Sequence, residues 1–103
     1  VPQMLFENNA KIAGRYFETE LGVLKEGAAA DVIIVDYDPL TPLNADNINS
    51  HLLFGVTGHD VVTTVANGKV LMKDRRLTQI DVEKVMADCR QAAAELAGRI
   101  NSR

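Results

Sequence analysis

Residues 21–36 read L-G-V-L-K-E-G-A-A-A-D-V-I-I-V-D, a glycine-punctuated segment that leads into an uninterrupted apolar run. Val32 to Val35 are all β-branched, and Asp31 and Asp36 bracket them. β-Branched residues favour strands, and a run without polar alternation predicts apolar contacts on both faces of the sheet. Gly22 and Gly27 predict a turn-rich connection before it. We therefore expect a central strand over Val32–Val35.

A second motif, V-V-T-T-V-A-N-G-K-V-L at residues 61–71, predicts a hairpin. Asn67 and Gly68 both tolerate positive φ, and an Asn-Gly pair between two β-rich runs is typical of a type I′ turn. A two-residue loop then sets the cross-strand pairs, which are Val65 with Val70, Thr63 with Met72, Thr64 with Leu71 and Ala66 with Lys69. The inner face would carry Val61, Thr63, Val65, Val70 and Met72, and the outer face Val62, Lys69 and Lys73.

Helical periodicity marks three further segments. Met4–Phe17 places its apolar residues near one face, which predicts a helix. After a loop over Tyr37–Pro42, where Pro39 and Pro42 end the strand, Asn44–Phe54 predicts a short helix capped by Asn44 or Asp46.

The best-specified helix follows Asp81, the expected N-cap, with Ile80 and Val85 as a hydrophobic staple and Gly98 as the terminating glycine. Its apolar stripe should pack against another element. The stripe consists of Val82, Val85, Met86, Cys89, Ala92, Ala93 and Leu96.

Length and charge set the class of protein. A chain of 103 residues is at most one domain with a small core, and 47% hydrophobic with 24% charged residues is ordinary for a soluble protein. A net charge of −3 argues against binding of nucleic acid, and no apolar run predicts a membrane segment or leader. One cysteine gives no internal disulfide, so we expect a cytoplasmic location. Because the chain opens on Val1, we also expect residues upstream.

The candidate metal ligands are few. His51 and His59 are the only histidines, and with Asp60 they could form a small metal site, although capping or surface roles are favoured by roughly twenty to one because a metal centre needs at least three converging ligands. A small metal-binding protein therefore stays open as one hypothesis.

The candidate nucleophiles and acid–base groups are equally weak. Cys89 lies on the apolar stripe of the last helix, which indicates a small buried hydrophobe rather than a thiolate. Ser50 and Ser102 lack a nucleophile-elbow context. Asp31 and Asp36 point to opposite faces of the strand, so together with Asp38 they are read as solvated strand ends. We therefore predict no catalytic, cofactor-binding or metal-binding residue in this chain.

The two motifs, taken in order, resemble those of the amidohydrolase superfamily. Residues 21–36 closely resemble its pattern G-x-L-x-x-G-x-x-A-D-ϕ-ϕ-ϕ-ϕ-D, where ϕ is apolar. Residues 61–71 resemble its V-x-x-V-ϕ-x-N-G-K-x-V hairpin, with Thr64 and Leu71 in place of two of its valines. Residues 37–44 and 47–55 resemble the deaminase and chlorohydrolase branch, and most of all its aminohydrolases associated with selenium metabolism. The resemblance covers nearly the whole chain.

The resemblance implies an α+β fold in three parts. Residues 1–20 would be the last helix of a (β/α)8 barrel, residues 21–80 part of a composite β-sandwich that contains the Asn-Gly hairpin, and residues 81–103 a C-terminal helix. The family uses one or two divalent metals, zinc or iron, held by histidines and an aspartate at the ends of barrel strands. Those positions would lie upstream of Val1, and His51, in the H-L-x-F-G segment, matches no family metal ligand.

Besides the small metal-binding protein, two classes of function stay open at this point. The first is the structural C-terminal portion of a metal-dependent amidohydrolase that hydrolyses a C–N or C–halogen bond of a small nitrogen heterocycle. Its partners would be the N-terminal segment and barrel of the same protein, and the chain alone would expose sheet edges and self-associate. The second is an autonomous, non-enzymatic interaction or oligomerisation module, which a complete hairpin and a capped helix would allow.

Overall fold

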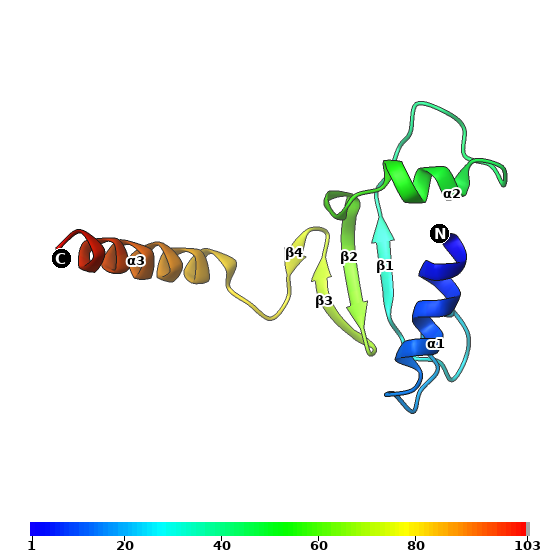
Figure 1. Cartoon of the computed structure of the whole chain (residues 1–103), viewed down its shortest axis with the longest axis horizontal. Helices are drawn as coiled ribbons and strands as arrows, with labels where there is room; N and C mark the ends of the chain where they lie inside the picture. The colour runs from blue at the N-terminus through cyan, green and yellow to red at the C-terminus, as the bar shows by residue number, and fades with distance from the viewer. Residues whose placement is uncertain (103) are drawn as a thin grey trace.

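The computed structural model describes residues 1–102 and is α+β, as expected. Short helices lie to one side of a four-stranded antiparallel sheet, and a long helix extends away from the other side (Figure 1). The elements, in chain order, are η1 (Met4–Asn8), α1 (Asn9–Ala13), β1 (Val32–Val35), α2 (Ile48–Ser50), η2 (His51–Gly55), η3 (Gly58–Asp60), β2 (Val61–Ala66), β3 (Lys69–Lys73), β4 (Arg76–Leu77) and α3 (Val82–Asn101).

The first helix ends earlier than its apolar periodicity predicts. Gly14 caps α1, and the next two residues make tight i→i−3 bonds, from Arg15 N–H to Ile12 O (3.2 Å) and from Tyr16 N–H to Ala13 O (2.9 Å). Tightened turns of this kind are common where a helix ends, and glycine lowers helix propensity. The predicted extension to Phe17 is therefore wrong.

β1 forms where predicted but lies at the edge of the sheet, in the order β1-β2-β3-β4. It pairs only with β2, antiparallel, with Val32 opposite Val65 and Ile34 opposite Thr63. Ile33 and Ile34 are each 56% exposed. The predicted central position is thus wrong for the chain by itself, whereas the expected exposure of a sheet edge is confirmed.

The Asn67-Gly68 turn is confirmed, with φ of 49° and 75° at its two residues. Val65 pairs with Val70, and Ala66 pairs with Lys69, both as predicted. Beyond them the register shifts, so that Thr64 and not Thr63 lies opposite Met72. An irregularity of this kind interrupts the alternation of faces, and the predicted inner face therefore does not continue through β3.

A second tight turn explains where β3 ends. Asp74 and Arg75 both have positive φ, 49° and 67°, and lead into β4. This turn contains no glycine that would have predicted it from the sequence. The Arg75 N–H donates to Val62 O at 2.8 Å, and the Thr78 hydroxyl donates to Val70 O at 2.5 Å. β4 was not predicted, because a type I′-like turn without Gly or Asn carries little sequence signal.

The short helix predicted within Asn44–Phe54 is present as α2 and η2. It begins at Ile48 after Asn47, and neither Asn44 nor Asp46 is its N-cap residue. The Asn44 side chain instead accepts from the N–H groups of Asp46 (2.9 Å) and Asn47 (3.1 Å). Asn44 therefore caps the turn that precedes the helix, an arrangement typical of Asx turns.

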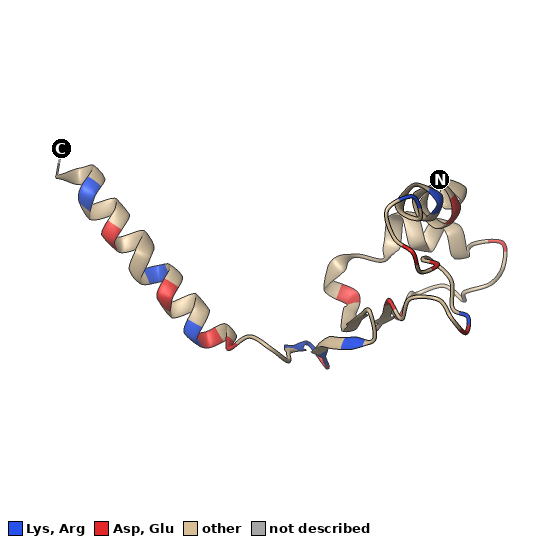
Figure 2. Cartoon of the chain, turned by 90° about the horizontal axis from the view of Figure 1, so that it is seen from below, with Lys and Arg blue, Asp and Glu red and all other residues tan. Residues whose placement is uncertain are grey.

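α3 begins as predicted and ends later. Asp81 Oδ1 accepts from the Lys84 N–H at 3.1 Å, which confirms the N-cap. Gly98 lies inside the helix, since the Ser102 N–H still donates to Gly98 O at 3.1 Å, so the predicted glycine stop is wrong. Acidic and basic residues alternate along the ribbon of α3 (Figure 2).

The apolar stripe of α3 has no covering element among residues 1–102. Val82, Val85, Met86 and Leu96 are between 44 and 51% exposed, and Cys89 is exposed as well. The predictions that this stripe packs and that Cys89 is buried are thus wrong for the chain alone. The stripe needs a partner outside the described residues before it can contribute packing energy.

Replacing Asp81 tests the cap of α3. We expect Asp81→Ala to destabilise the first turn by about 1 kcal/mol, because the Lys84 N–H loses its acceptor. The measurement is amide hydrogen exchange of residues 82–85 in the full-length protein that contains this chain. Asp88→Ala is the control, since the exposed Lys84–Asp88 pair at 3.5 Å is worth about 0.5 kcal/mol or less. Equal effects of the two substitutions would contradict the cap.

The described chain has no core of its own. No side chain of residues 1–102 is buried, and the chain exposes 8838 Å². A compact monomer of this mass exposes about 5,700 Å². Its radius of gyration is 19.4 Å, against about 13 Å for a compact domain of this length. The expected small core is therefore not formed by these residues alone. Within the same residues, no helix is both long and apolar enough to cross a membrane.

Candidate functional site

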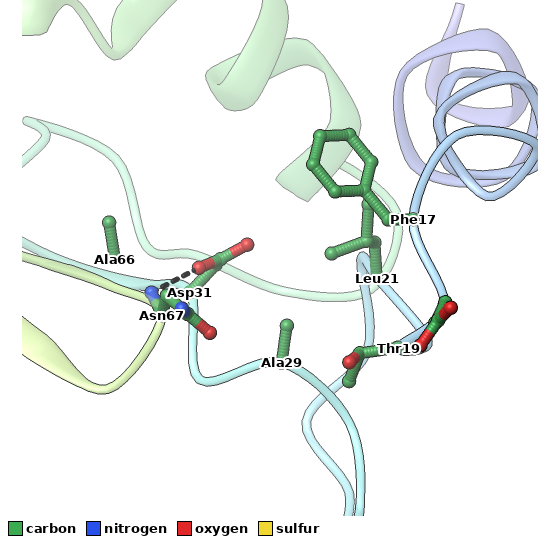
Figure 3. A pocket seen from close by; sticks show the side chains of 8 residues that line it. Phe17, Thr19, Leu21, Ala29, Asp31, Ala66 and Asn67 are labelled. Atoms are coloured by element: carbon green, nitrogen blue, oxygen red, sulfur yellow. Dashed lines mark hydrogen bonds between the residues drawn. The ribbon is translucent and has the colours of Figure 1, made fainter.

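The two sequence motifs meet in the structure. The Asp31 carboxylate accepts a hydrogen bond from the Asn67 N–H, with Oδ1 and N 2.6 Å apart. One residue earlier, Ala30 O accepts from the Gly68 N–H at 3.0 Å. The end of the first motif thus holds the hairpin turn of the second (Figure 3). We call these four residues the motif junction.

Local structure explains why the junction forms. Antiparallel pairing of Val32 with Val65 brings Asp31 and Ala30 alongside the turn at the end of β2. In a type I′ turn both central residues have positive φ, which leaves their N–H groups free to donate outside the hairpin. A carboxylate is the stronger acceptor for such a donor. Asp31 is exposed at the end of the strand, as the sequence suggested, and it also has a structural hydrogen bond that the sequence did not predict.

A cavity of about 470 Å³ lies beside the motif junction. Phe17 and Leu21 lie on one side of it, and Asp31 and Asn67 lie on the other (Figure 3). Its lining carries neither a histidine nor a cysteine, so it offers no imidazole base and no thiol. The full lining is Phe17, Glu18, Thr19, Leu21, Ala29, Asp31, Ala66 and Asn67.

His51 is bonded through both ring nitrogens. Nδ1 lies 2.6 Å from the Tyr37 hydroxyl oxygen, and Nε2 lies 3.2 Å from Thr41 Oγ1. The rings of Tyr37 and His51 meet edge to face, with centroids 5.7 Å apart. The sequence did not single out Tyr37 or Thr41, because their contacts with His51 span 14 and 10 positions. His51 thus has two hydroxyl partners and no free ring nitrogen.

The other proposed metal ligands have separate roles. His59 accepts from the Arg75 guanidinium through its backbone oxygen, at 2.5 Å. The Asp60 carboxylate accepts from the Thr57 N–H at 2.6 Å, as one half of a capping box around η3, and also from the Thr57 hydroxyl at 3.2 Å. Over residues 1–102, no three His, Cys, Asp or Glu side chains come close enough to hold a metal ion. The alternative metal site of His51, His59 and Asp60 is therefore not assembled.

The remaining candidates are scattered. Asp31 and Asp36 flank opposite ends of β1, and the Asp36 N–H donates to Asp60 O at 2.7 Å. The Ser102 hydroxyl donates to Arg99 O at 3.1 Å, and Ser50 ends α2. Asp38 lies in the loop after β1. The prediction that this chain supplies no catalytic or cofactor-binding residue stays a prediction.

Comparison with known proteins gives close sequence relatives. The 5'-deoxyadenosine deaminase of Methanosarcina barkeri is 43% identical over 102 residues, which are 99% of this chain and 23% of that protein. The enzyme of the same name from Methanosarcina mazei is 44% identical over 104 residues, with the same two shares. The chain is homologous to part of these deaminases. The resemblance to the deaminase branch of the amidohydrolases is thereby confirmed.

A third deaminase relative carries a related name. The 5-methylthioadenosine/S-adenosylhomocysteine deaminase of Dictyoglomus thermophilum is 37% identical over 93 residues, 90% of this chain and 21% of that protein. No family model and no solved structure matches the chain. The chain spans less than a quarter of the length of these deaminases. The finer placement beside the aminohydrolases of selenium metabolism stays a prediction.

Proposed function

We propose that this chain is the C-terminal, non-catalytic portion of a deaminase that acts on adenosine derivatives. The observation that carries the proposal is the identity of 43% to a 5'-deoxyadenosine deaminase across 99% of the chain, both motifs included. Such an enzyme replaces the exocyclic amine of the adenine ring with oxygen from water and releases ammonia. The proposed deamination is a specific case of the C–N bond hydrolysis in a nitrogen heterocycle that the sequence predicts.

The division of the chain follows the same proposal. Residues 1–20 close the barrel with its last helix, residues 21–80 form part of the composite β-sandwich, and residues 81–103 form the terminal helix. The motif junction supports the middle part, because it joins the segment before β1 to the β2–β3 turn in one unit. The barrel and the N-terminal segment are the proposed partners, and they would cover the free edge of β1 and the apolar stripe of α3.

The metal of the proposed enzyme would be bound outside this chain. The described residues do not fit a divalent ion, since no three donor side chains converge among residues 1–102. We therefore assign zinc or iron, and the groups that activate water, to the barrel. This chain would contribute to the fold that holds the barrel together and not to the reacting atoms. A cytoplasmic location fits adenosine derivatives as substrates.

The test is an activity assay on the full-length protein. We expect ammonia release from 5'-deoxyadenosine, 5-methylthioadenosine or S-adenosylhomocysteine, and none after removal of the metal with a chelator. A chlorinated nitrogen heterocycle serves as the comparison substrate for the chlorohydrolase chemistry of the same branch. Metal-loaded protein that releases no ammonia from any adenosine derivative would overturn the proposal.

The alternative, an autonomous interaction module, has less support. An autonomous module needs a hydrophobic core, and no side chain of residues 1–102 is buried. The exposed stripe of α3 alone would favour an interaction surface. The stripe of α3 is exposed together with both faces of β1. Its exposure is therefore explained equally well if the chain is part of a larger protein.

A further inference from the structure

The loop between β1 and α2 is held by one imidazole. It runs from residue 36 to residue 47 without helix or strand and contains both Pro39 and Pro42. Two of its hydroxyl groups, those of Tyr37 and Thr41, bond to opposite nitrogens of His51. Residues 38–40 thus form a small bend, and the residues on either side of it, Tyr37 and Thr41, both bond to the His51 side chain. Leu40 stands at the tip of the bend, fully exposed.

Both bonds can form whichever nitrogen carries the proton. A hydroxyl group donates or accepts as required, so either neutral tautomer of His51 satisfies Tyr37 and Thr41 together. Tyr37 and His51 are half-buried, which limits competition from water at the shorter of the two bonds. The second half of the loop is fixed separately, since Asn47 Nδ2 donates to Pro42 O at 2.8 Å.

Gly55 makes room for the Tyr37 ring. A Cβ atom at position 55 would lie 2.1 Å from the Tyr37 hydroxyl oxygen and 2.9 Å from the ring carbon that bears it. Real Cβ contacts are not that short, so any side chain at this position must expel the ring. The helix is locally widened into a π-turn over His51–Gly55, which brings Gly55 to the same side as His51. π-Turns are frequent where a helix has a specific role.

We propose that Tyr37, Thr41 and His51 form a latch that straps the loop onto the helix at residues 48–55, with Gly55 as the seat of the tyrosine ring. The latch fixes the bend at residues 38–40 in one conformation before any partner reaches it. His51 is therefore a positioning residue for this loop and not a metal ligand. The proposal does not depend on the deaminase activity proposed above.

The experiment is limited proteolysis of the full-length protein with a protease that cleaves after large apolar residues. Mass mapping of the fragments measures the rate of cleavage between Leu40 and Thr41. Loss of one hydrogen bond of ordinary net strength should raise the cutting rate about fivefold, and loss of both about 25-fold. We therefore expect about fivefold for Tyr37→Phe and for Thr41→Val, and about 25-fold for His51→Ala. His59→Ala is the matched control and should leave the rate unchanged.

The double variants separate a latch from general loosening. If the hydroxyl groups act through His51, Tyr37→Phe should add nothing in the His51→Ala background. Gly55→Ala displaces only the Tyr37 ring and should match Tyr37→Phe. If the Gly55→Ala variant does not fold, Tyr37→Phe still decides. The proposal is overturned if His51→Ala cuts no faster than His59→Ala, or if Tyr37→Phe keeps its full effect without His51. Neither result would bear on ammonia release, so the two proposals fail separately.

Discussion

The 103-residue chain expressed alone is expected to self-associate or aggregate instead of behaving as a folded monomer. It exposes 8838 Å², and the excess over a compact monomer of its mass is roughly 3,000 Å². Obligate interfaces bury about 2,000 to 5,000 Å² counted over both partners, so the excess on this one chain is at least as large as one partner's share of such an interface. The free edge of β1 offers unpaired N–H and C=O groups between exposed Ile33 and Ile34. A second copy would cover these groups when no other partner is present.

Size-exclusion chromatography with light scattering measures this directly, over a range of concentrations. Ile33→Lys should shift the chain towards the monomer, because a lysine on an edge strand opposes edge-to-edge pairing. Ile33→Val is the matched control, since it keeps a β-branched apolar side chain at the same position. A wild-type chain that stays monomeric at high concentration and unfolds cooperatively would refute both the expected association and the incompleteness behind it.

Local signals predicted the elements of this fold well. The β-branched run gave β1, Asn67-Gly68 gave the β2–β3 turn, and Asp81 gave the start of α3, because each depends on neighbours within a few positions. The predicted register holds for the two pairs next to the turn and fails at the next one, where Thr64 takes the place of Thr63 opposite Met72. The position of such a bulge depends on where the next turn begins. No residue of the hairpin motif predicts that position.

Long-range contacts were beyond the reach of the sequence. The bond from Asn67 to Asp31 spans 36 positions, and nothing in the spacing of aspartates distinguishes Asp31 from Asp36. The packing predicted for α3 and the central position predicted for β1 failed for a different reason. Both predictions read an apolar surface correctly, but no element among residues 1–102 covers that surface. An apolar stripe predicts that another segment packs on it, but it does not identify that segment.

Breaking the motif junction should destabilise the full-length protein more than any other single carboxylate substitution in this chain. Asp31→Ala removes the charged acceptor of the Asn67 N–H, and hydrogen bonds to charged groups contribute about 1.5 to 3 kcal/mol. We expect a loss of about 2 kcal/mol in the free energy of unfolding, measured from the denaturant midpoint. Asp31→Asn keeps a neutral acceptor oxygen in place and should lose about 1 kcal/mol or less.

The control is Asp36→Ala, at the other end of β1, because only the backbone of Asp36 is bonded, to Asp60 O. Its loss should stay within about 0.5 kcal/mol, as for ordinary surface positions. Hydrogen exchange gives a local reading of the same bond, since the Asn67 amide donates to Asp31 and the adjacent Gly68 amide donates to the backbone of Ala30. In Asp31→Ala the Asn67 amide should lose protection before the Gly68 amide does. Equal losses of protection at both amides would mean that the turn is held by the strand pairing alone and that the Asp31 carboxylate contributes nothing specific.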